Sequence, residues 1–222
     1  MHFTTLDAEA ALESALASIG SSERLLICGR PDEKENLQEM IDLSTDSESS
    51  ILEMSKQVDI DAWFTERKKI YSEEWEEFGE SESEILGAWP EEPLVLHSIS
   101  LHKDILTVNF LPKVTVAHVS VAHPWEIPAK LKYGGWNECP EPAIHCALWK
   151  RWHERYGAEI VGCSHNVIEA IVARPPINQA DALALAWEQF FYCPDIVYQG
   201  VASVSNLAST LMNHKTWYFW WD

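Results

Sequence analysis

Apolar and polar residues alternate along the chain with two different periods, three to four residues in some segments and two residues in others. The longer period is typical of helices with one buried face, and the shorter one of strands. In the first half of the chain this pattern predicts three helices, one short buried strand and one polar loop. The helices span 7–19, 32–43 and 59–79, the strand spans 24–28, and the loop spans 44–50.

The helix over 59–79 has the clearest pattern in the first half. Asp59 is placed to cap its first turn, and one stripe of apolar side chains follows at spacings of three and four. The stripe comprises Ile60, Trp63, Phe64, Ile70, Tyr71, Trp75 and Phe78, with Arg67 among them. Most glutamates of the segment lie on the opposite side. We interpret the stripe as part of the core, and a groove for a partner is the alternative.

The second half of the chain favours strands, because β-branched and aromatic residues are frequent there. Asn178 is expected to cap a helix, with Asp181 three residues later. The aromatic segment 217–221 carries large side chains on both of its faces, which predicts a central or covered strand. The pattern predicts strands over 94–96, 105–108, 114–121, 158–162, 167–174 and 217–221, and helices over 140–156, 179–192 and 205–212.

Together these elements predict an α+β fold. A C-terminal sheet of mostly antiparallel strands is expected to pack with the helices around 141–156 and 179–192. The N-terminal part is expected to be acidic and mainly helical. Pro90 and Pro93 interrupt the chain between the two parts. We therefore divide the chain into an N-terminal region, residues 1–93, and a tryptophan-rich C-terminal domain, residues 94–222.

The net charge of −19 is concentrated in the N-terminal region, which contains 24 Asp and Glu residues but only 7 Lys and Arg residues. A surface of this kind repels nucleic acid and anionic membranes and attracts a basic partner. The alternative is that the charge only keeps a tryptophan-rich protein in solution. The densest run supplies six candidate partner-binding residues: Glu73, Glu76, Glu77, Glu80, Glu82 and Glu84.

No segment approaches the roughly 20 apolar residues of a membrane span, and the N-terminus lacks the pattern of a secretion signal. We expect a cytoplasmic protein with reduced thiols, because the five cysteines are odd in number and irregularly spaced. Cys139, His145 and Cys146 lack the spacing of zinc ligands. The sequence therefore predicts no metal and no cofactor.

Several short motifs of the second half occur together in one order. They are Gly134-Gly135-Trp136-Asn137-Glu138-Cys139-Pro140, Trp152-His153-Glu154-Arg155-Tyr156-Gly157-Ala158-Glu159, Arg174-Pro175-Pro176, Glu188-Gln189-Phe190-Phe191-Tyr192-Cys193-Pro194-Asp195, Gln199-Gly200 and Trp217-Tyr218-Phe219-Trp220-Trp221-Asp222. In this order they resemble the bacterial family called domain of unknown function 4253, over roughly residues 115–222. That family has no established activity, so the resemblance implies no catalytic residue. Members of such families often lie among bacterial toxin–immunity genes. The N-terminal half resembles no family that we can name.

These observations leave two hypotheses about function. The first is a non-enzymatic binding protein, an immunity-type protein or antagonist of a basic protein, for which the acidic N-terminal region would accelerate association. The second is an enzyme or small-ligand-binding protein whose polar residues converge in one cleft. Cys193 could be a nucleophile there, although a cysteine beside a proline at a helix end is more often structural. The candidate pocket residues are Trp136, Asn137, Glu188, Cys193, Asp195 and Gln199.

Overall fold

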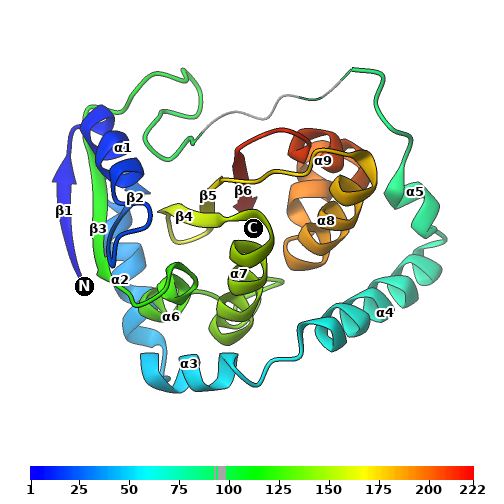
Figure 1. The fold of residues 1–222 in the computed structure, drawn as a ribbon, viewed down its shortest axis with the longest axis horizontal. Coiled ribbons are helices and arrows are strands. Elements are labelled where there is room, and N and C mark those ends of the chain that lie inside the picture. Colours follow the sequence, from blue (N-terminus) through cyan, green and yellow to red (C-terminus); the bar gives the residue numbers. More distant parts are fainter. Residues whose placement is uncertain (93, 95–98) are drawn as a thin grey trace.

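The computed structural model of the protein describes residues 1–92, 94 and 99–222. Its strands form one six-stranded sheet in the order β1-β3-β2-β4-β5-β6 (Figure 1). The strands are β1 (His2–Leu6), β2 (Glu23–Gly29), β3 (Val114–Ser120), β4 (Ala158–Cys163), β5 (Val167–Val172) and β6 (Thr216–Trp220). Neighbouring strands are antiparallel except β2 and β4, which are parallel. The sheet is therefore mostly antiparallel and the fold is α+β, as predicted.

The strand β2 lies inside this sheet although it comes from the N-terminal region. Leu26 of β2 is paired with Ala117 of β3 on one side, and Ile27 is paired with Gly162 of β4 on the other. Strands from both sides of residue 93 thus alternate in one sheet. Without β2, the strands β3 and β4 would have no common neighbour.

The predicted helices of both halves are present in the structure. Asp59 caps its helix by accepting a hydrogen bond from the Ala62 amide at 3.0 Å, and Asn178 accepts one from the Asp181 amide at 3.0 Å. None of the helices in the described part of the chain is long and apolar enough to cross a membrane. The helices are α1 (Ala8–Ala17), α2 (Glu33–Leu43), α3 (Glu48–Ser55), α4 (Ile60–Phe78), α5 (Glu82–Leu86), α6 (Ile127–Leu131), α7 (Pro142–Tyr156), α8 (Gln179–Tyr192) and α9 (Val204–Leu211), with short helical turns at Pro124–Glu126 and Ile196–Val201.

One face of the sheet is covered by α7 and α8 and holds an aromatic core. Trp152 of α7 stacks on Phe219 of β6, with ring centroids 5.7 Å apart and the ring planes 2° from parallel. Tyr192 of α8 packs edge-on against the same Phe219 ring at 4.9 Å. Stacked and edge-to-face rings add to the stabilisation from buried apolar area. The long helix α4 lies outside α8, on the side away from the sheet (Figure 1).

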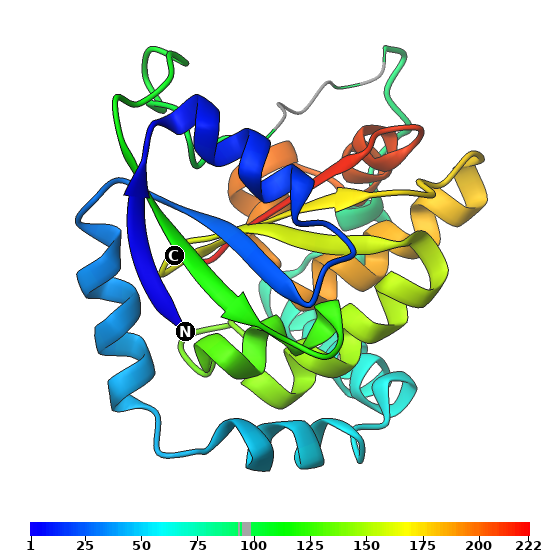
Figure 2. The same cartoon turned by 60° about the vertical axis from the view of Figure 1, so that its left-hand side comes forward.

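The opposite face of the sheet is covered by α1 and by residues 99–111. Alanines on α1 pack closely on β2 and β3, where Ala11 and Val116 are both fully buried. Ile99 and Leu111 pack in the same cluster, which also includes Val161 of β4. Figure 2 shows α1 lying across the strands, with α6 and α7 on the other side of the sheet. The two faces therefore differ, because one is aromatic and packed by long helices and the other is aliphatic and packed partly by loop.

Three predictions from the sequence differ from the structure, and a fourth concerns residues that the structure mostly does not describe. The segment 105–108 is not a strand: the Asp104 carboxylate accepts hydrogen bonds from the amides of Leu106 and Thr107, which fold the chain into a turn. The polar stretch 44–50 is a loop only up to residue 47, since α3 begins at Glu48. The segment 217–221 lies at the edge of the sheet and is not a central strand, although its Trp217, Phe219 and Trp221 side chains are buried, as expected of a covered strand. Most of the predicted strand 94–96 lies outside the described residues.

Candidate functional site

The six candidate partner-binding glutamates all lie on the surface, along the second half of α4 and on through α5. Each of them is exposed to solvent. Glu82 is paired with Lys68 at 2.8 Å, and Glu73 lies 4.0 Å from Lys69. We call the surface formed by Glu73, Glu74, Glu76, Glu77, Glu80, Glu82 and Glu84 the acidic surface. Gly79, with a φ of 74°, ends α4 within it and turns the chain toward α5.

Two aromatic side chains lie beside these carboxylates and are open to solvent. Phe78, the last residue of α4, is 72% exposed, although it continues the apolar stripe of the helix. The Tyr198 ring is 48% exposed, and its hydroxyl accepts a hydrogen bond from the buried Trp75 indole at 2.8 Å. Burial of the Tyr198 phenol raises its pKa, and the charges of Glu74 and Glu80 raise it further. The acidic surface thus contains both charge and exposed aromatic area.

The inner side of α4 is fixed to the C-terminal domain. Tyr71 and Trp75 are buried against Phe190 of α8. The Arg67 guanidinium donates to the Glu138 carboxylate at 2.6 Å and to the Phe191 carbonyl at 3.2 Å. Most of the apolar stripe is therefore core, as we interpreted it, whereas Ile70 is 44% exposed and the final residue, Phe78, is 72% exposed.

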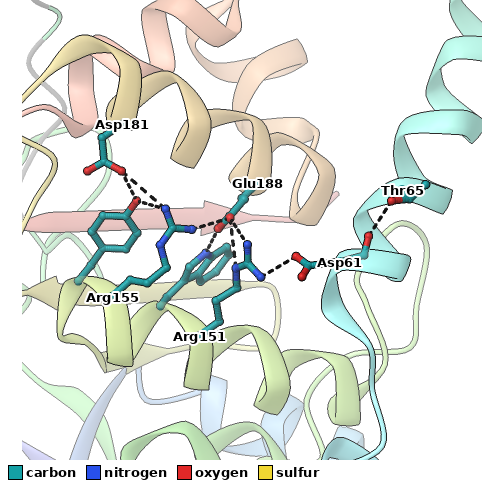
Figure 3. A network of polar contacts seen from close by, with 8 residues as sticks. Asp61, Thr65, Arg151, Arg155, Asp181 and Glu188 are labelled. Atoms are coloured by element: carbon teal, nitrogen blue, oxygen red, sulfur yellow. Dashed lines mark hydrogen bonds and ion pairs between the residues drawn. The ribbon is translucent and has the colours of Figure 1, made fainter.

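Glu188, a candidate pocket residue, is engaged in a network between helices (Figure 3). Its carboxylate accepts hydrogen bonds from Arg151 at 3.0 Å, from Arg155 at 2.7 Å and from the Trp152 indole at 2.8 Å. Arg151 also pairs with Asp61 at the start of α4, at 2.8 Å. The network joins α4, α7 and α8, which gives Glu188 a structural role.

Three other candidate pocket residues meet around the backbone of Asp222. The Asn137 side chain donates to the Asp222 carbonyl. The Asp195 carboxylate accepts from the Asp222 amide at 3.1 Å and from the Gln199 side chain at 3.0 Å. Their polar groups hold the segment that follows β6.

Cys193 and Trp136 take no part in these hydrogen bonds to Asp222. The Cys193 thiol is fully buried and donates to the Trp220 carbonyl at 3.0 Å, and burial raises its pKa far above the range in which a thiolate forms. Trp136 packs edge-on against Tyr133 and lines a shallow hollow with residues of α2. The six candidate pocket residues thus do not form one cluster, because Asn137, Asp195 and Gln199 meet at Asp222 whereas Glu188 belongs to the network between helices.

The turn that carries Trp136 needs its glycines. Gly134 has a φ of 113°, and a side chain there would place its Cβ 1.9 Å from the Pro140 carbonyl oxygen. Gly135 also has a positive φ, 87°. Only glycine adopts this backbone and fits this space, so the motif forms a tight turn that packs on His145.

A buried chain of polar groups lies beneath this turn. The His145 ring is hydrogen-bonded to the Tyr192 hydroxyl at 2.7 Å and lies 3.4 Å from the Cys139 sulfur. Burial lowers the pKa of His145 to about 3 and raises that of Cys139, so both groups are neutral. All five cysteines are buried, free thiols. Within residues 1–92, 94 and 99–222, no group of three or more His, Cys, Asp or Glu side chains is placed to hold a metal ion.

A cavity of about 310 Å³ lies at the carboxyl ends of the parallel strands β2 and β4 and was not predicted from the sequence. Its polar wall includes Arg30 and Glu33, which follow β2, and Tyr218, which is far from both in the sequence. The Gly29-Arg30-Pro31 turn after a buried strand was the one signal that could have indicated it. None of the six candidate pocket residues lines this cavity.

Comparison with known proteins identifies one related family. No curated protein and no solved structure matches the chain significantly. The matching segment begins in β3 and contains β4, β5 and β6, whereas β1 and β2 precede it. Residues 115–222 match the family described as Domain of unknown function (DUF4253), which confirms the resemblance that the ordered motifs predicted.

Proposed function

We propose that the protein is a non-enzymatic binding protein that holds a basic partner protein on its acidic surface, as an immunity-type protein or antagonist does. One observation carries this proposal: the exposed Phe78 ring lies within the densest group of exposed carboxylates of the chain. A large aromatic side chain surrounded by charge has the composition of an interface hot spot and its polar rim. A partner with basic residues around an apolar pocket would complement it.

The packing of α4 on the C-terminal domain supports this function. Its inner side is held by Tyr71, Trp75 and Arg67, so the acidic surface is presented on a rigid helix. A preorganised surface loses little conformational entropy when it binds. The charge of the N-terminal region would attract a basic partner over a distance of about a Debye length, roughly 8–10 Å at ordinary ionic strength.

The alternative, an enzyme built from the candidate pocket residues, has less support. These residues hold helices or the backbone of Asp222, and the Cys193 thiol is buried with a raised pKa. A nucleophile needs an accessible thiolate or an adjacent base. We therefore favour binding over catalysis at these residues.

The test compares two variants that change the net charge equally. In the first, Glu76, Glu77, Glu80 and Glu84 are replaced by lysine, which leaves the Lys68–Glu82 pair intact. In the control, the exposed Glu9, Glu13, Glu35 and Glu39 of α1 and α2 are replaced by lysine. Immobilised wild-type protein and both variants are exposed to lysate of the source organism, and retained proteins are identified by mass spectrometry.

The proposal predicts one basic protein that is retained by the wild type and the control and lost by the first variant. With that partner purified, we expect the first variant to associate at least about tenfold more slowly. Phe78→Ala should mainly accelerate dissociation, by about tenfold or more, whereas Ile177→Ala, another exposed apolar residue, should not. If all three proteins retain the partner equally, the proposal is contradicted and the acidic surface only keeps the protein in solution.

A further inference from the structure

The cavity at the carboxyl ends of β2 and β4 lies on the face of the sheet that α1 covers only in part. Four segments form it: the turn into α2, the loop 100–111, the turn between β4 and β5, and β6. Its volume of about 310 Å³ is at the lower end of the range for small-molecule sites. The lining residues are Gly29, Arg30, Glu33, Ser100, Leu101, Lys103, Asp104, Ile105, Val108, Leu111, Ser164, Asn166, Val167 and Tyr218.

A buried carboxylate holds the loop wall of the cavity in place. Glu169 of β5 is 1% exposed and accepts hydrogen bonds from the Ser100 amide at 2.6 Å, from the Ser100 hydroxyl and from the Leu101 amide at 3.2 Å. Leu101 then packs against Gly162, where an added Cβ would lie 3.0 Å from the leucine side chain. Hydrogen bonds and close packing therefore hold this wall of the cavity in place.

The charged side chains at the rim already have polar partners. Arg30 pairs with Asp104 at 2.6 Å, and Glu33 accepts from the His165 ring at 2.7 Å. Burial raises the pKa of the Glu169 carboxyl, and its hydrogen bonds with Ser100 and Leu101 and the charge of Lys103 act in the opposite direction. An ionic ligand would compete with these partners, whereas an uncharged ligand would leave them intact.

Two lining residues, Tyr218 and Asn166, carry hydrogen-bond donors for an uncharged ligand. Tyr218 of β6 is 39% exposed, and burial followed by the Glu169 charge raises its pKa to about 12, so the phenol stays a donor at neutral pH. The Asn166 amide supplies a second donor from the turn between β4 and β5. A carbonyl-type oxygen would accept hydrogen bonds from both.

The outer wall of the cavity is apolar and open to solvent. Ile105 is 89% exposed and Val108 56% exposed, and both line the cavity. Val108 has a φ of 60°, a strained conformation for a β-branched residue. A ligand with an apolar body would cover these side chains, which have no other cover in the described structure.

We propose that this cavity binds a small, uncharged organic molecule with a ring-sized apolar body and a carbonyl oxygen, such as an amide or ester, and that Tyr218 and Asn166 donate to that oxygen. This site is separate from the acidic surface and does not depend on the function proposed for it. Because the charged groups at the rim already have partners, carboxylates and amidinium ions of the same shape should bind more weakly.

Three aromatic probes of one shape and different charge test the proposal: benzamide, benzoate and benzamidine. Each is titrated into the full-length protein while amide and aromatic NMR signals are recorded. We expect benzamide to bind in the millimolar range that suits so small a probe, with shifts at Val108, Asn166 and Tyr218. Benzoate and benzamidine should bind at least about fivefold more weakly, because each disturbs a paired charge at the rim.

Tyr218→Phe and Asn166→Leu should each weaken benzamide binding by roughly three- to tenfold. Tyr198→Phe, which removes a phenol outside the cavity, should have no effect. Circular dichroism establishes that the variants are folded. Tighter binding of either ion, binding that both cavity variants leave unchanged, or no binding of benzamide at millimolar concentration would each overturn the proposal.

Discussion

The N-terminal residues 1–92 and the family segment 115–222 contribute different things to one molecule. The family segment contains most of the aromatic core, including the fully buried Trp149, Trp152 and Trp221. The N-terminal residues carry most of the charge and pack on that core from outside through α4, yet they also insert β2 between β3 and β4. The segment that matches the family therefore lacks a strand that its own sheet requires. The segment that sequence similarity identifies is therefore shorter than the segment that forms the complete sheet.

The largest effect is expected when the two regions are separated. A chain of residues 115–222 alone would lose the partner strand of both β3 and β4, together with the cover that α1 gives to one face. We expect it to be insoluble or to lack a cooperative unfolding transition. The measurement is near-ultraviolet circular dichroism of its tryptophans during thermal unfolding. A sharp transition in the isolated segment would show that β2 is dispensable.

The second largest effect is expected on stability, where removal of the Glu188 carboxylate between the helices is compared with removal of an exposed surface carboxylate. Glu188 is 12% exposed and accepts from two arginines and from Trp152. Glu188→Ala should lower the free energy of unfolding by about 2–4 kcal/mol, because it leaves Arg151 and Arg155 without their shared acceptor. Glu53→Ala, which breaks the exposed pair with Lys56, serves as the control and should leave stability unchanged. Chemical denaturation measures both, and equal effects would contradict the contrast.

Acid should destabilise the core through His145. Its pKa is about 3 in the folded protein and 6.5 in the unfolded chain, so below pH 6.5 only the unfolded chain takes up the proton. This contribution to stability is complete above pH 6.5 and is lost as the pH falls, by about 1.4 kcal/mol per pH unit.

The His145 effect is isolated by comparison with His145→Gln, which keeps a polar group near Tyr192. Unfolding free energies of both proteins are measured between pH 7 and pH 5. The wild type should show the steeper loss, with a difference of about 2 kcal/mol at pH 5. Parallel curves for the two proteins would mean that His145 is protonated within the fold.

The smallest effect concerns local opening and not global stability. We expect limited proteolysis to cut first at 44–50 or 79–92, where the chain is exposed and acidic, and later within the family segment. Mass spectrometry of early fragments locates the cuts. First cuts inside 158–200 would show that the family segment is the less stable part.

Local signals in the sequence were sufficient to predict most helices and the strands β4 and β5. Apolar spacing and capping residues such as Asp59 and Asn178 act within a few residues of the element they define. The apolar run 105–108 was misleading because the single side chain of Asp104 folds it into a turn. In that case a local polar group overrides strand propensity.

Features made by distant parts of the chain could not be predicted in this way. The position of β2 depends on pairing with strands more than 80 residues away. The cavity is missed for the same reason, since Arg30, Asn166 and Tyr218 meet only in the folded sheet. Sequence motifs drew attention to Cys193 and Glu188, whose polar groups turned out to support helices and strands.

The central claim, that the acidic surface captures a basic partner, is tested most directly by the salt dependence of association with the partner identified by capture. The association rate constant is measured for the wild type at several ionic strengths, alongside the dissociation rate constant. Screening of a long-range attraction should slow association by about tenfold or more between low and high salt, while dissociation changes little. An association rate constant that does not vary with salt would contradict the account.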